Sequence, residues 1–379
     1  MRGRLKVLCA WAVLAAVPAV SRAQITPAGG SAAPDDTQPA SSRVGAVIFY
    51  DYSYQHSPKT ADAAGNSISP SSFNVARAYL NVTGSISHLV SYRITPDISA
   101  SRFSSTESNS LNGSLVFRLK YAYAQVSLAD WTGKWTGTYL RLGVQQTPFI
   151  DFQESIYRYR FQGTVFAERD GGMSSSDAGV SFHSNIPSGY GDLQVGLYNG
   201  EGYNGAEPND QKAVMARGTV RPMPMGGALA RGVRLTAYYF GDHYLKNYDR
   251  RRLLGNFALE QRKYNLSIDY MKRVDQGKTP PDQTRTESGG YSVVLTPFFK
   301  EKGNGWEALL RYDRFRPDSN GSPDRLQQRT IAGLAYWFPH PGGNGTAALM
   351  LDYEGVTFTN FAPTRPAQRR IALHGLINF

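Results

Sequence analysis

From Arg43 to its last residue, the chain repeats one pattern, in which short stretches alternate apolar and non-apolar residues. In "NLSIDYM", for example, Leu266 and Ile268 alternate with Ser267 and Asp269. Successive side chains of a β-strand point to opposite faces, so each stretch predicts a strand with one apolar and one polar face. Stretches rich in turn-forming residues separate the strands. The pattern therefore predicts an all-β protein.

Sixteen such stretches can be counted, and the spacers between them alternate in length. The stretches begin near residues 43, 72, 88, 114, 138, 174, 191, 212, 230, 251, 264, 288, 305, 328, 346 and 368. Short turns are expected near 85–87, 186–190, 261–263, 299–304 and 339–345, and long polar spacers near 55–71, 99–113, 148–173, 200–211, 275–287, 316–327 and 358–367. Short periplasmic turns and long external loops are typical of transmembrane antiparallel β-barrels. We therefore predict a barrel of about 16 strands.

The final stretch, "IALHGLINF", alternates up to Phe379, with Ile371, Leu373 and Ile377 on its apolar side. In a closed barrel the last strand pairs with the first, so neither strand has an exposed edge. The stretch also resembles the C-terminal signal of outer-membrane proteins, an alternating strand that ends in phenylalanine. Tryptophans near the ends of strands are expected at the membrane interface. They are Trp131, Trp135, Trp306 and Trp337.

Residues 1–23 have the parts of a secretory signal peptide, namely a basic start, an apolar run and a cleavage site after Ala23. Residues 24–42 are rich in proline, alanine, serine and glycine and are predicted to be a disordered lead-in to a barrel domain at 43–379. The only cysteine, Cys9, leaves with the signal peptide. Four of the 41 basic residues leave too, and the remaining 37 face 30 acidic residues, a net charge of +7. Nucleic acid, anionic lipid and small anions are all compatible with that charge.

Five stretches resemble the phosphate-selective porin O and P family in their order and spacing. They are "FNVARAYLNVTGSI" (73–86), "YRITPDIS" (92–99), "YLRLGVQQTPF" (139–149), "TVFAERD" (164–170) and "LYNGEGYNG" (197–205). The resemblance is sharpest over 70–205. It implies a homotrimeric porin in the outer membrane of a Gram-negative bacterium, in which an inward-folded segment at 148–173 narrows the lumen.

With the apolar side of each strand facing lipid, the inward side carries many basic residues. The predicted anion pathway consists of Arg158, Arg160 and Arg169 on the inward-folded segment and Arg77, Arg93, Arg118, Lys120 and Arg141 on the wall. Cations along a narrow, low-dielectric wall lower the cost of removing water from phosphate, and guanidinium groups offer paired donors to its oxygens. Glu154 and Glu168 are candidate partners that orient the arginines. In the alternative interpretation, the inward arginines form ion pairs that only brace the wall.

The sequence thus predicts a porin for passive diffusion of small anions, phosphate or polyphosphate in particular, and not an enzyme. Small anions and outer-membrane lipid are the expected partners; no nucleic acid, metal or cofactor is expected, because the histidines lack ligand spacing and no phosphate-binding loop is present. Carboxylates dilute the charge of the 148–173 segment, so a general, weakly selective porin is the main alternative. A lipase-like barrel using His88, His183 or His374, and an adhesive barrel with a filled core, are further alternatives.

Overall fold

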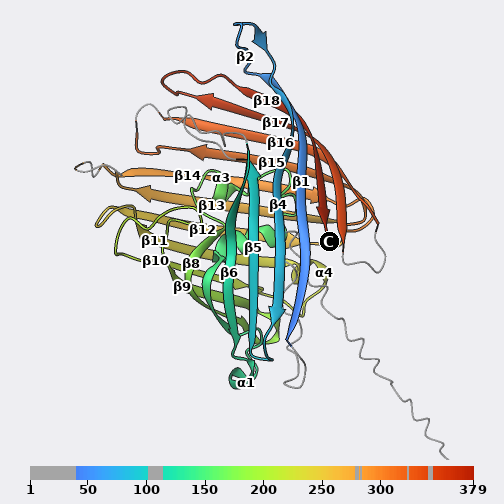
Figure 1. Cartoon of the computed structure of the whole chain (residues 1–379), viewed down its shortest axis with the longest axis vertical. Coiled ribbons are helices and arrows are strands. Elements are labelled where there is room, and N and C mark those ends of the chain that lie inside the picture. Colours follow the sequence, from blue (N-terminus) through green and yellow to red (C-terminus); the bar gives the residue numbers. More distant parts are fainter. Residues whose placement is uncertain (1–39, 101–113, 278–280, 282–283, 322–323, 340–344) are drawn as a thin grey trace, which may run out of the picture.

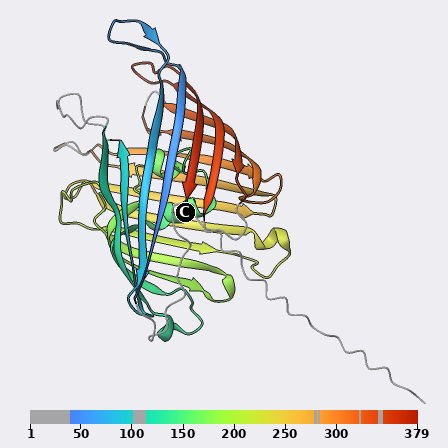
Figure 2. The same ribbon diagram turned by 45° about the vertical axis from the view of Figure 1, so that its right-hand side comes forward.

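The computed structural model describes residues 40–100, 114–277, 281, 284–321, 324–339 and 345–379. Sixteen antiparallel strands form one closed barrel (Figures 1 and 2). Their bounds are β1 Ser41–Ser57, β4 Ser71–Ser85, β5 Val90–Ala100, β6 Leu115–Ser127, β7 Tyr139–Gln146, β8 Ser176–Ile186, β9 Gly191–Tyr198, β10 Ala213–Val220, β11 Val233–His243, β12 Asp249–Glu260, β13 Tyr264–Asp275, β14 Thr286–Pro297, β15 Gly305–Arg316, β16 Leu326–Trp337, β17 Thr346–Thr359 and β18 Gln368–Asn378. A small hairpin of β2 Thr60–Ala61 and β3 Ser67–Ile68 projects beyond the barrel between β1 and β4 (Figure 1). The predicted fold class, an antiparallel β-barrel of about 16 strands, is confirmed.

The strands follow the predicted stretches closely, and every observed start lies within three residues of the expected one. The largest difference is at β11, which starts at Val233 where the sequence predicts 230. β1 starts at Ser41, two residues before 43. The signal peptide and residues 24–39 of the lead-in lie outside the described residues, so both assignments stay predictions.

The barrel closes where its last strand meets its first. β18 pairs with β1 along most of its length, and β1 pairs with β4 on its other side. The N–H of Phe379 donates to the carbonyl of Ala46 at 3.0 Å, and the N–H of Ala46 donates back at 2.8 Å. Closure satisfies the backbone groups that an edge strand would leave unpaired, which a lipid environment requires.

The two rims of the barrel differ in the length of their connections. One, which we call the long-loop rim, has the connections 58–70, 101–114, 147–175, 199–212, 244–248, 276–285, 317–325 and 360–367. The opposite, short-turn rim has 86–89, 128–138, 187–190, 221–232, 261–263, 298–304 and 338–345. The predicted alternation fails at three of them, because 244–248 is short whereas 128–138 and 221–232 are long.

Short helical turns account for the two longer connections at the short-turn rim. They contain α1 (Ala129–Thr132) and α4 (Ala228–Arg231), and a 3-10 turn, η1 (Pro187–Gly189), lies at the same rim. A period-two pattern cannot reveal such turns. Among the residues that the structure covers, no helix has the length and apolar character needed to cross a membrane.

The outer surface of the barrel is apolar and the inner surface is polar. On the outer face, Leu253, Tyr270 and Leu351 are 57%, 61% and 57% exposed in the isolated chain. Asp269 and Asp352 face inward and are 1% and 2% exposed. The alternation that predicts the strands therefore also predicts, for most of them, which side chains enter the lumen.

Strand β6 is an exception, because it reverses its faces part-way. The sequence predicts Tyr121 on the lipid side, and this is wrong. Thr95 pairs with Tyr121, but the next residue, Pro96, pairs with Leu119, so Lys120 is the extra residue of a β-bulge. Lys120 and Tyr121 are consequently both buried inside the barrel. Proline has no N–H to give to the ladder and is found in strand interiors mainly at bulges, which explains the position.

Trp337 is another aromatic residue whose side the sequence predicts wrongly. Trp131, Trp135 and Trp306 are exposed at the short-turn rim, as expected of an interfacial belt. Trp337 is 0% exposed and points into the lumen. A position near the end of a strand does not determine which face of the sheet a side chain is on. Its place in the alternation along the strand does.

Candidate functional site

The connection 147–175 folds back into the barrel (Figures 1 and 2). It contains α2 (Pro148–Ile156) and α3 (Phe166–Arg169). Proline has a fixed φ angle that suits the first turn of a helix, and α2 begins at Pro148, two residues after β7 ends at Gln146. Seven of the nine residues of α2 are buried, which is expected of a helix inside the barrel. The predicted inward fold is confirmed, and we call residues 148–173 the inward segment.

Aromatic side chains attach the inward segment to the wall. Tyr159 and Phe161 each lie edge-on to Trp337, with ring centroids 6.0 Å apart. Phe161 also lies 6.4 Å from Phe49 on β1. Each such pair contributes about 0.5–1.5 kcal/mol beyond its burial. Sequence reasoning missed this cluster; its signal is the stretch "YRYRF", in which aromatic residues alternate with arginines.

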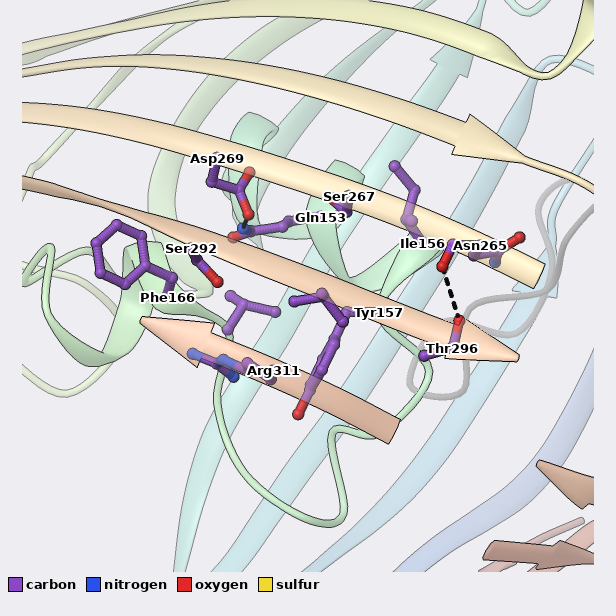
Figure 3. Close-up of a pocket in the computed structure, with 12 residues that line it drawn as sticks. Gln153, Ile156, Tyr157, Phe166, Asn265, Ser267, Asp269, Ser292, Thr296 and Arg311 are labelled. Atoms are coloured by element: carbon purple, nitrogen blue, oxygen red, sulfur yellow. Dashed lines mark hydrogen bonds between the residues drawn. The ribbon is translucent and has the colours of Figure 1, made fainter. Parts of the chain in front are cut away.

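A small cavity separates the inward segment from β13, β14 and β15 (Figure 3). It leaves about 20 Å³ for the centre of a water molecule, enough for one water but not for a larger solute. Gln153 donates to Asp269 at 2.6 Å on one side, and Arg311 donates to the carbonyl of Thr164 at 2.8 Å on the other. These bonds connect the inward segment to β13 and β15 on either side of the cavity.

Arg158 is held against the wall by a buried carboxylate. Its Nη1 lies 2.9 Å from Oε1 of Glu307, and its guanidinium lies 4.1 Å from the centroid of a Trp337 ring. Glu307 also accepts from the hydroxyl of Tyr159 at 2.7 Å and from the N–H of Gly303 at 2.5 Å. The Glu307 carboxylate therefore fastens the inward segment to β15 and neutralises Arg158.

The other two predicted cations of the inward segment are also paired. Arg160 contacts Glu154 at 2.8 Å and Glu168 at 3.1 Å, the two carboxylates that the sequence indicated. Burial raises the pKa of Glu154, and the charge of Arg160 opposes that rise. Arg169 lies 3.4 Å from Glu354 on β17. The arginines of the inward segment therefore form ion pairs, as in the alternative interpretation in which such pairs brace the wall.

Lys120 on the wall has a different environment. It is 1% exposed, and Nζ donates to the hydroxyl of Tyr79 at 3.3 Å. The ammonium lies 4.7 Å from the ring centroid of Tyr79 and 5.4 Å from that of Tyr121. No carboxylate among the described residues lies within ion-pair distance of it. Aromatic faces attract a cation without cancelling its charge.

Arg141 on β7 has the same kind of environment. It donates to Gln125 at 2.8 Å and to Gln146 at 3.0 Å. Its guanidinium lies 4.4 Å from the ring centroid of Tyr123 and 4.7 Å from that of Tyr139. Within the described ranges it forms no ion pair, so its charge is not neutralised.

Arg93 on β5 lies between polar and aromatic groups. It donates to Asn81 at 2.8 Å and to Thr95 at 2.9 Å, and it stacks 4.4 Å from the ring centroid of Tyr121. It is 2% exposed, so these groups hold it firmly in place.

Arg77 and Arg118 flank Asp97, which is buried. Arg77 forms an ion pair with Asp97 and donates to the hydroxyl of Tyr203 at 3.3 Å. Arg118 lies opposite Asp97 in the register of β5 and β6. Arg118 is half-buried and forms no hydrogen bond or ion pair in the part of the chain that the structure covers. One carboxylate thus lies beside two cations.

Four of these cations occupy successive levels along one side of the lumen. β6 runs from the long-loop rim to the short-turn rim, and Arg118 and Lys120 lie in its first half. In the strand register, Arg93 and Arg141 lie level with its second half. We call Arg118, Lys120, Arg93 and Arg141 the cation line. It follows the wall from one rim toward the other.

A second surplus of positive charge surrounds Glu354. Its carboxylate pairs with Arg169, with Arg329 on β16, and with Arg370 on β18 at 2.5 Å. Three cations therefore share one carboxylate near the long-loop rim. The pairing of β17 with β18, which sets Glu354 opposite Arg370, creates this cluster.

The three histidines considered for catalysis each lie beside an aspartate. The pairs are His88–Asp130 at 3.1 Å, His183–Asp192 at 3.4 Å and His374–Asp352 at 3.1 Å. The described residues include no group of three or more side chains that could hold a metal ion.

Comparison with known proteins identifies the sequence family. The sequence model of the family described as phosphate-selective porin O and P matches residues 48–283. A search of the curated proteins finds no match.

Solved structures of outer-membrane porins share the fold. OmpT of Vibrio cholerae with its loop L8 deleted matches with a TM-score of 0.60 and 11% identity, covering 90% of this chain and 100% of that one. The anion-selective porin from Comamonas acidovorans matches with a TM-score of 0.58 and 12% identity, covering 90% and 100%. A trimer form of in-vitro folded OmpT from Vibrio cholerae matches with a TM-score of 0.54 and 11% identity, again covering 90% and 100%.

Proposed function

The chain belongs to the phosphate-selective porin O and P family and is an outer-membrane porin, and on this premise we propose that its lumen conducts small anions, phosphate and polyphosphate among them. The observation that carries the proposal is the cation line. Its members Lys120 and Arg141 keep their charge on the wall, whereas the arginines of the inward segment are paired with carboxylates. A channel wall with unneutralised cations favours anions.

We place the passage between the inward segment and strands β4–β7, because the cation line lies on that wall and the inward segment is hydrogen-bonded to β13 and β15 on the other side. Lys120 on the wall and Glu154 and Arg160 on the inward segment are all buried, so we place the narrowest level of the proposed passage at these three groups. They are 1%, 4% and 6% exposed. An anion at this level loses much of its water and touches the side chains directly.

The chemistry of the wall suits phosphate. Charged donors form short, strong hydrogen bonds to its oxygens, and the tyrosine rings keep the donors in position. Several weak sites in sequence let an ion leave as well as enter. The long-loop rim faces the exterior, as is usual for outer-membrane barrels. Anions therefore first meet the arginines around Glu354 and then the cation line.

Single-channel recording of the refolded protein across a potassium chloride gradient tests the proposal. We expect a reversal potential that favours chloride and a current that falls when phosphate is added. Preference for potassium would contradict an anion pathway. Preference for chloride without block by phosphate would reduce the function to that of a general, weakly selective porin, which the carboxylates of the inward segment favour.

Replacing Glu354 by glutamine is expected to deepen phosphate block from the long-loop side by about tenfold, since a charge-assisted hydrogen bond contributes roughly 1.5 kcal/mol or more. The substitution removes the one carboxylate that three arginines share. The measurement is the phosphate concentration that halves the current, with phosphate on each side in turn. Glu207→Gln, in an exposed connection of the same rim, is the matched control. Equal effects of the two substitutions would mean that only the charge of the rim matters.

We also infer that the protein is a homotrimer, as the family resemblance implies and as the trimer form of OmpT, a protein of the same fold, supports. Light scattering of the detergent-solubilised protein, corrected for bound detergent, measures the mass of the protein alone. A mass of one or two chains would contradict this inference.

A further inference from the structure

A group of basic side chains lies on the outer face of the barrel, close to the long-loop rim. Its members are Arg251 on β12, Lys272 on β13, and Arg314 and Arg316 on β15, and we call them the outer basic patch. The side chains of Arg251, Lys272 and Arg316 are 58%, 50% and 44% exposed. Outward charges on a lipid-facing wall are costly unless something of opposite charge meets them.

The strand register places Lys272 and Arg316 around an opening. Lys272 pairs with Gly289, and Gly289 pairs with Arg316 on its other side. The two basic residues are therefore two strands apart, about 10 Å, with no side chain between them. Arg314 lies two residues before Arg316 on β15, on the same face and nearer the middle of the barrel. The cations thus surround a gap in which a phosphate group fits.

The residues below the patch follow the order of the layers of a membrane. The next row toward the middle of the barrel contains Tyr270 and Tyr291, which pair with each other, and Arg314 lies at its β15 end, opposite Tyr291. The row after it contains Ile268 and Val293. Basic, aromatic and aliphatic rows correspond in turn to lipid headgroups, the interface and the hydrocarbon core. The patch is therefore at the level of the headgroups.

The patch has more positive than negative charge. The four residues of the patch and the neighbouring Arg285 carry five positive charges. The carboxylates paired with them are Asp249, Glu287 and Asp324, which leaves 5 − 3 = +2. Arg314 has no hydrogen-bond or ion-pair partner among the described residues. The pairs Lys272–Glu287, at 3.1 Å, and Arg316–Asp324, at 3.2 Å, are exposed. Exposed pairs contribute little, so a phosphate can replace either carboxylate.

We propose that the outer basic patch binds a phosphate-bearing lipid of the outer leaflet. The proposal rests on the orientation given under the proposed function, in which the long-loop rim faces the exterior. The bound group is the headgroup of a lipid and not a free ion, because the acyl chains would lie along the apolar rows directly beneath the patch.

Native mass spectrometry of the protein in detergent micelles tests this, with diphosphorylated lipid A as the probe. The test variant is K272Q/R314Q/R316Q, and the control is K59Q/K212Q/K246Q, which removes three charges from connections of the same rim. We expect the test variant to lose affinity for lipid A by roughly 100-fold, since each basic side chain near an anionic lipid surface contributes a factor of about five. The control variant shows how much binding depends on the total charge of the protein. Dephosphorylated lipid A shows how much binding depends on the acyl chains alone.

Four results would overturn the proposal. Three concern binding, namely equal losses in the two variants, equal binding of dephosphorylated lipid A, and full competition by inorganic phosphate at the concentration of the lipid. The fourth is a change in the oligomeric mass of the test variant, which would make the patch a contact between subunits instead. Single-channel conductance of the test variant should match the wild type, which confirms folding. Failure of the wild type to conduct anions would remove the proposed function and leave the lipid result unaffected.

Discussion

Replacing Lys120 by glutamine is expected to weaken block of the channel by phosphate roughly 10- to 100-fold, because a hydrogen bond from a charged donor contributes about 1.5–3 kcal/mol. Lys120 lies at the narrowest level and is held by two tyrosine rings instead of a carboxylate. Its removal breaks no ion pair among the described residues. The reversal potential in a potassium chloride gradient should shift toward cation preference in the same recordings.

Two further variants show whether the charge of Lys120 or its shape matters. Lys120→Arg keeps the charge and should retain most of the block. Lys263→Gln removes one positive charge from an exposed turn at the short-turn rim and should leave block unchanged. If Lys120→Gln and Lys263→Gln had equal effects, the cation line would have no special part in selecting ions.

Replacing Glu307 by alanine is expected to release the inward segment and raise the single-channel conductance severalfold. The substitution leaves Arg158 buried without its partner, which costs about 3–5 kcal/mol and favours movement of the segment away from the wall. The strand ladders do not depend on this contact, so the barrel should still form. Trypsin should then cut at Arg158 and Arg160, which are 7% and 6% exposed in the intact structure.

A double variant separates loss of the anchor from damage to the fold. Arg158→Met together with Glu307→Leu removes both buried charges and keeps their volume, so the conductance should return close to that of the wild type. Glu301→Gln, in the exposed turn before β15, serves as the control for loss of a carboxylate. Unchanged conductance in Glu307→Ala would mean that the contacts of Trp337 with Tyr159 and Phe161 hold the segment without the ion pair.

The barrel itself could be predicted from the sequence because its signal is local. A strand that separates lipid from water must alternate, and the alternation is visible within a few residues. The same local rule predicted the inward side of β13, where Ser267 and Asp269 are buried. The inward fold at 148–173 was predicted from the family resemblance, and the buried faces of α2 confirm it.

Local rules failed where the chain departs from regular pairing. The bulge at Lys120 moves Tyr121 from the lipid to the lumen, and Tyr123, beside Arg141, follows it. Pro96 was the available signal, but its effect appears on the neighbouring strand and not on its own. Trp337 was assigned to the interface from its distance to the strand end, although its parity is that of a lumen residue.

The sequence alone determined the strands, most of their faces and the presence of many cations in the lumen. Only the tertiary structure decided which of those cations keep their charge. Arg158 meets Glu307 across 149 residues of sequence, and Arg169 meets Glu354 across 185. Alternation depends on the backbone of one strand, whereas neutralisation of a charge depends on which carboxylate the folded chain brings within about 4 Å of it. That distance is set by the closure of the barrel and the path of the inward segment, and no local pattern contains it.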